Sequence, residues 1–122
     1  MKEEKFSVKA RINSFKYAWN GLKILFVFEH NARIHVLAAF LVVVLSWVLK
    51  ISSLEWLAVV GAIAMVFIAE LVNSSIEKMA DVISPGQNKN IARVKDLAAA
   101  AVLVAAIFAV IVFGVIFFPK MF

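Results

Sequence analysis

Residues 54–83, LEWLAVVGAIAMVFIAELVNSSIEKMADVI, contain the pattern that decides the fold. After Glu55, residues 56–69 are an uncharged apolar run, and polar side chains then appear at Glu70, Asn73, Glu77 and Asp81. At about 1.5 Å per residue, some thirty helical residues reach roughly 45 Å, which exceeds the thickness of a bilayer's hydrocarbon core. The segment therefore predicts a membrane-spanning helix whose second half emerges at the membrane surface.

The composition of the 122-residue chain agrees with a membrane protein. Hydrophobic residues make up 64% of it, more than a water-soluble core of this size could bury. The absence of cysteine excludes disulfides, thiolate metal sites and a cysteine nucleophile. The net charge of +5 could suggest nucleic acid, but the basic residues crowd the N-terminal region and flank apolar runs. Anionic lipid headgroups explain that placement better, so no nucleic-acid partner is expected.

The remaining segments complete an all-α membrane protein with a single domain, residues 1–122. Apolar residues at helical spacing among lysines predict an interfacial amphipathic helix at the N-terminus. Two further apolar runs predict spanning helices, and a Pro-Gly loop at residues 84–90 joins the last two spans. The predicted segments are the amphipathic helix at 5–33 and the spans at 34–51, 54–83 and 94–118.

The distribution of basic residues predicts the orientation. Seven of the thirteen Lys and Arg residues precede residue 34, and four more surround the polar loop. Because cytoplasmic loops carry the excess of Lys and Arg, the amphipathic helix and the 84–90 loop are predicted to face the cytoplasm. The polar end of segment 54–83 then faces the same side.

Glu70, Asn73, Glu77 and Asp81 form what we call the polar stripe. At about 100° per residue they share an arc of roughly 80° on one helix face. Carboxylates beside hydrocarbon cost several kcal/mol unless they are protonated or neutralised by a cation. Oxygen ligands of this kind suit a divalent cation, and Glu29, at the end of the amphipathic helix, could add a ligand from a second element.

Lys95 and Asp96 are predicted to open the last helix at the same boundary, where a lysine and free N–H groups could hold phosphate. Carboxylates for Mg²⁺, a lysine for phosphate and a carboxylate beside a hydroxyl are what phosphoryl transfer needs. The chain has no Gly-x-x-x-x-Gly-Lys-Ser/Thr loop and no protein-kinase motif. His30 and His35 are interpreted as polar interface residues rather than metal ligands, because their i, i+5 spacing does not place them on one helix face.

Two alternatives from other classes fit parts of the pattern. A small proton-coupled multidrug exporter also uses an intramembrane Glu, but it needs that acid near the bilayer midplane, whereas Glu70 lies toward the cytoplasmic end. A non-catalytic membrane scaffold could use the polar stripe only to pack helices.

Three motifs and one acid stand out in the sequence: ELVNSSIEKMAD (70–81), KDLAAAAVL (95–103), WNGLK (19–23), and Glu29 before the first span. Together they resemble the small bacterial lipid kinases. These are diacylglycerol kinase and its undecaprenol kinase relatives, and the resemblance covers nearly the whole chain. It implies an enzyme of the bacterial inner membrane that uses ATP and Mg²⁺ to phosphorylate a lipid alcohol at the cytoplasmic face. It also implies a homotrimer with sites shared between neighbouring subunits.

The resemblance implies a role for each matching residue. Glu70 matches the general base on the lipid hydroxyl, and Asn73 an amide that orients the site. Glu29 and Glu77 match the pair that holds Mg²⁺. The remaining matches are Lys95, Asp96 and Tyr17 at the nucleotide, and Trp19, Lys23 and Ala99 at the lipid. Asp96 is also expected to be one of the catalytic residues, with Glu70 and Asn73.

The chain also departs from the family pattern. Ala10 stands where a basic nucleotide contact is expected, with Arg11 beside it, and His35 where some members have an acid. The 84–90 loop also differs, so its nucleotide contacts, Gly86, Gln87 and Asn88, are assigned from their polar, donor-rich character. The loop and the C-terminal FGVIFFPKMF favour undecaprenol over diacylglycerol as the substrate.

Overall fold

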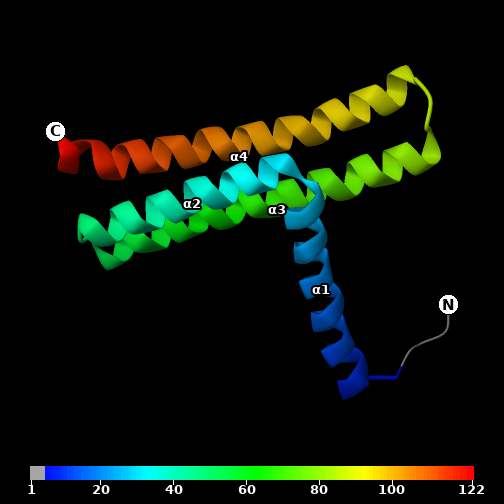
Figure 1. Cartoon of the computed structure of the whole chain (residues 1–122), viewed down its shortest axis with the longest axis horizontal. Helices are drawn as coiled ribbons and strands as arrows, with labels where there is room; N and C mark the ends of the chain where they lie inside the picture. Colours follow the sequence, from blue (N-terminus) through cyan, green and yellow to red (C-terminus); the bar gives the residue numbers. More distant parts are fainter. Residues whose placement is uncertain (1–4) are drawn as a thin grey trace.

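A computed structural model describes residues 5–122, which form four helices and no strand. The helices are α1 (Val8–Phe28), α2 (His30–Val48), α3 (Ser53–Ile83) and α4 (Lys89–Met121). The last three are long and apolar enough to cross a membrane. Figure 1 shows them running side by side, while α1 leaves the bundle at a steep angle. The predicted all-α architecture with three spanning helices after an N-terminal helix is therefore confirmed.

The predicted first segment, 5–33, is divided at Glu29, whose backbone is extended (φ −106°, ψ 114°). Neither glycine nor proline marks this break. Arg33, in the first turn of α2, reaches back to the end of α1 instead: its Nε donates to the Phe26 carbonyl at 3.0 Å, and its Nη2 donates to the Val27 carbonyl. Because the last carbonyls of a helix lack intrahelical partners, this side chain stabilises the α1–α2 elbow at Glu29.

The end of α1 is also attached to α3. Leu25 is the buried residue of α1, and the Phe26 ring meets the Phe67 ring edge-on, with centroids 6.1 Å apart. Lys78 places its Nζ 5.7 Å from the centre of the Phe28 ring, within cation–π distance. The elbow is thus fixed on the polar half of α3.

A tight turn reverses the chain between α2 and α3, as the short link predicts. The N–H groups of Lys50 and Ile51 donate to the carbonyls of Trp47 and Ser46, both at 3.3 Å. This is a Schellman ending, with Lys50 in the left-handed conformation at φ 52°. Helix α3 then begins with a capping box between Ser52 and Glu55.

Two buried clusters hold the three long helices together. Near the α2–α3 turn, Ile51 and Val59 pack against Ile116 and Phe117. Farther along the α3–α4 interface the buried residues are mostly alanines, which let two helix backbones approach closely in a membrane. This second cluster consists of Ala62, Val66, Ala105 and Ala109.

Helix α4 is longer at both ends than the predicted 94–118. It starts at Lys89 because the Asn88 side chain accepts hydrogen bonds from the N–H groups of Asn90 and Ile91. It continues through Pro119 to Met121, so proline lies in the last turn rather than after it. Beside it, Lys120 pairs with Glu55 of α3 at 3.3 Å.

The α3–α4 hairpin extends beyond the start of α2, as Figure 1 shows. His35 and Glu70 lie at the same level because they are in contact. From Glu70 to Ile83, α3 rises about 20 Å, whereas α2 rises only about 7.5 Å from His35 back to His30. The hairpin therefore overhangs the elbow by about 12 Å.

Candidate active site

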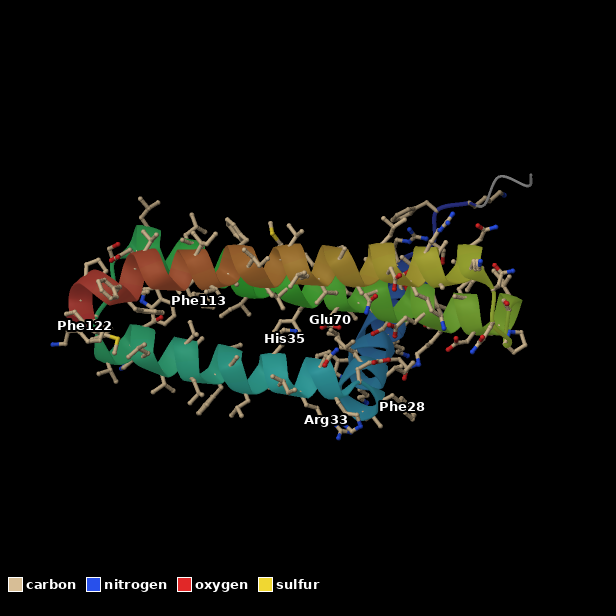
Figure 2. The ribbon with its side chains drawn as sticks, turned by 90° about the horizontal axis from the view of Figure 1, so that it is seen from above. Phe28, Arg33, His35, Glu70, Phe113 and Phe122 are labelled. Carbon is tan, nitrogen blue, oxygen red and sulfur yellow. The ribbon has the colours of Figure 1, made fainter. Side chains whose placement is uncertain are left out.

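Glu70 is the most deeply buried acid that the structure describes. Only 2% of its side chain is exposed, and its Oε1 lies 3.0 Å from Nε2 of His35 on α2, a side chain that is 25% exposed. Figure 2 shows the two side chains facing each other between the helices. The sequence predicts that Glu70 needs compensation by protonation or by a cation, and the structure gives it His35 as a hydrogen-bond partner. The sequence does not predict this role for His35, which is interpreted there as a polar interface residue.

One turn farther along α3, two buried polar atoms lack partners. Asn73 and Ser74 are 8% and 6% exposed, and within residues 5–122 the Asn73 Oδ1 and Ser74 Oγ accept or donate no hydrogen bond. An unsatisfied buried polar atom costs about 1–3 kcal/mol. Asn73 lines a groove of about 490 Å³ between α3 and α4, whose other lining is apolar. The site therefore holds polar atoms that a bound group could satisfy.

Glu29 and Glu77, the predicted metal ligands, are both half-buried. Glu29 lies at the elbow and lines a groove of about 290 Å³ between α1 and α3 together with Ser74 and Lys78. Among the described residues, no three His, Asp or Glu side chains gather into a metal-binding group. One or two carboxylates are nevertheless what Mg²⁺ takes from a protein when phosphates supply its other ligands. The two carboxylates are thus of the kind that Mg²⁺ prefers, but Glu77 does not line the groove that Glu29 borders.

The 84–90 loop forms a third groove, of about 570 Å³. Gly86, Gln87, Asn88 and Lys95 all line it, so the structure brings together these predicted nucleotide contacts. Lys95 lies in the second turn of α4, not at its start, and its Nζ is 2.5 Å from Oδ1 of Asp81. Asp96 is exposed beside it.

The predicted lipid contacts on α1 lie apart from Glu70 in the single chain. Trp19 and Lys23 line a groove formed by α1 alone, together with Phe15 and Lys16. Tyr17 is also exposed on this helix. Ala99 is exposed on α4, next to Ala98 in the Asn73 groove.

A buried carboxylate on helices that could span a membrane, with a polar loop groove beyond it, is the arrangement expected of the membrane enzymes that the sequence resembles. Comparison with known proteins agrees: the sequence matches the family described as prokaryotic diacylglycerol kinase over residues 16–117. The chain belongs to that family, and its enzyme class is that of lipid kinases.

Three relatives illustrate the similarity. A diacylglycerol kinase of Synechocystis sp. is 34% identical over 109 residues, which are 88% of this chain and 62% of that protein. The diacylglycerol kinase of Escherichia coli K12 is 33% identical over 100 residues, 82% of each chain. The undecaprenol kinase of Bacillus subtilis 168 is 30% identical over 120 residues, 98% of each chain. These relatives differ in the lipid that their names specify.

Proposed function

We propose that this protein transfers the γ-phosphoryl group of Mg-ATP to the hydroxyl of a membrane lipid alcohol, with Glu70 as the general base. The burial of Glu70 in the spanning bundle is the observation that carries the proposal. Family membership favours this kinase over the exporter and scaffold alternatives.

The proposed reaction assigns a proton acceptor and a leaving group. The lipid hydroxyl oxygen attacks the γ-phosphorus, the bond from that phosphorus to the β-bridging oxygen breaks, and ADP leaves. Oε2 of Glu70 takes the hydroxyl proton, since Oε1 is occupied by His35. Asn73, one turn away, orients the reacting groups through its unpaired Oδ1.

Other residues would hold the nucleotide. Glu29 and Glu77 would bind Mg²⁺, which supplies charge neutralisation to the phosphates when bound. Lys95 would contact phosphate from the loop groove, flanked by Asp96 and by the polar groups of Gly86, Gln87 and Asn88. The overhang of the α3–α4 hairpin supports a cytoplasmic site next to the inner membrane, in agreement with the basic residues around the loop.

A homotrimer with shared sites is part of the proposal. In a single chain, Tyr17, Trp19 and Lys23 lie on exposed faces of α1, outside the grooves that Glu29 and Asn73 line. Neighbouring subunits would bring such faces to one another's α3 and α4. Mixing subunits inactivated at Glu70 with subunits inactivated at Glu77 tests this point, because shared sites would restore part of the activity.

The lipid is proposed to be undecaprenol, with diacylglycerol as the alternative. Support comes from the loop, from the C-terminal sequence and from the full-length match to an undecaprenol kinase. Both alcohols present a primary hydroxyl at the interface, so the same chemistry serves either. The preferred substrate is the one with the higher kcat/KM when both are assayed with radiolabelled ATP in mixed micelles.

The base assignment is tested with Glu70→Gln, which keeps the size of the side chain. We expect kcat to fall about 10²- to 10⁴-fold, the usual contribution of a general base. Glu55→Gln is the matched control, because it makes the same change in the first turn of α3, far from Glu70, and should leave turnover intact. Full turnover by Glu70→Gln with either lipid would refute the assignment.

A further inference from the structure

The contact between His35 and Glu70 has a consequence for how the base is held. His35 Nε2 lies 3.0 Å from Oε1, and it is the one hydrogen-bond partner of the Glu70 carboxylate among residues 5–122. The two residues come from different helices, α2 and α3, and no third acid or histidine joins them in a metal-binding group within this part of the chain. Within this part of the chain, neither residue forms another ion pair.

We propose that His35 is a positioning residue for the general base. An Nε2–H donated to Oε1 fixes the plane of the carboxylate and leaves Oε2 as the oxygen that accepts the proton from the lipid hydroxyl. The proposal rests on the assignment of Glu70 as the base. It extends that assignment with a second residue, which does not itself touch the lipid or the nucleotide.

The surroundings of the pair make this contact important. His35 borders a cavity of about 170 Å³ whose other lining is apolar and includes Ala39, Phe67 and Phe113. Figure 2 shows Phe113 of α4 facing the space between α4 and α2, as the His35–Glu70 pair does. The Glu70 side chain is almost fully buried and has no other hydrogen-bond partner among residues 5–122, so its orientation depends on the imidazole. Without His35, Glu70 would be free to rotate at the terminal torsion of its side chain, which is broad.

His35→Ala and His35→Gln separate positioning from packing. We expect His35→Ala to lower kcat about 10- to 100-fold, because small misplacements of a reacting group have effects of this size, while the KM for ATP stays within about twofold. His35→Gln places an amide N–H near the position of Nε2 and should restore kcat to within about threefold of the parent. His30→Gln, an exposed histidine in the first turn of the same helix, is the matched control and should leave kcat unchanged.

A double-variant cycle identifies the residue through which His35 acts. In a Glu70→Gln background, His35→Ala should cause no further loss, because residues that act as a unit are non-additive. An equal additional loss in that background would overturn the proposal, as would a His35→Gln protein that folds normally but is as slow as His35→Ala. If Glu70→Gln retains full turnover, the base assignment fails and positioning fails with it. If Glu70→Gln is inactive while His35→Ala is fully active, the positioning proposal alone is wrong.

Discussion

The ion pair between Lys95 and Asp81 should compete with the nucleotide for the lysine. Lys95 lines the groove of the 84–90 loop, and its Nζ lies 2.5 Å from Oδ1 of Asp81. If Lys95 binds phosphate, as proposed, this contact must be released or shared when Mg-ATP arrives. Asp81→Asn removes the competing charge, and we therefore expect it to strengthen nucleotide binding.

The size of the effect follows from the exposure of the pair. The two side chains are 38% and 65% exposed, and ion pairs in such positions contribute about 0.2–1 kcal/mol. Removing a competitor of this strength lowers the Kd for Mg-ATP by a factor of about 1.4 to 5. The gain should shrink at high ionic strength, since salt screens exposed charges. Lys95→Met loses the phosphate contact itself and should weaken binding about 10- to 100-fold, because hydrogen bonds to charged groups contribute about 1.5–3 kcal/mol.

Calorimetric titration of Mg-ATP into the purified protein measures both variants, at low and at high salt. The KM for ATP in the lipid kinase assay is the second measurement. Weaker binding by Asp81→Asn would mean that Asp81 assists nucleotide binding instead of competing for Lys95. Unchanged binding by Lys95→Met would remove Lys95 from the site.

Three further predictions concern the fold. Arg33→Ala should loosen the α1–α2 elbow. The distribution of distances between spin labels, attached to cysteines introduced into α1 and α3, should then become broader. An unchanged distribution would mean that Arg33 does not stabilise the elbow. Ala105→Leu should destabilise the α3–α4 interface by about 1–3 kcal/mol in denaturant unfolding, whereas exposed Ala100→Leu should not. Lys50→Gly should stabilise the protein by up to about 1 kcal/mol, because glycine adopts positive φ freely; a lower melting temperature would contradict this.

The sequence predicts the spanning helices well because their signal is local. Length and apolar content decide whether a segment crosses a bilayer, and both can be counted along the chain. The polar stripe on α3 could also be predicted, since helical periodicity alone places Glu70 and Asn73 on one face, and both are buried in the structure.

The features that the sequence does not predict depend on contacts between segments. The break at Glu29 has no glycine or proline to announce it and relies on Arg33 reaching back from the next helix. The early start of α4 rests on the Asn88 cap, which lies inside what composition alone assigns to a loop. The pairing of His35 with Glu70 joins residues 35 positions apart, so the position of His35 along its own helix could not reveal its partner.

The overhang of the α3–α4 hairpin lets two substrates of opposite solubility reach one protein. Headgroups add only about 5–8 Å on each side of a hydrocarbon core. With the elbow at the edge of that core, a projection of about 12 Å would carry residues 84–90 through this layer into the aqueous phase. A lipid alcohol can diffuse laterally within its leaflet while the nucleotide stays in water. Neither substrate therefore has to leave the membrane or the aqueous phase to reach the protein.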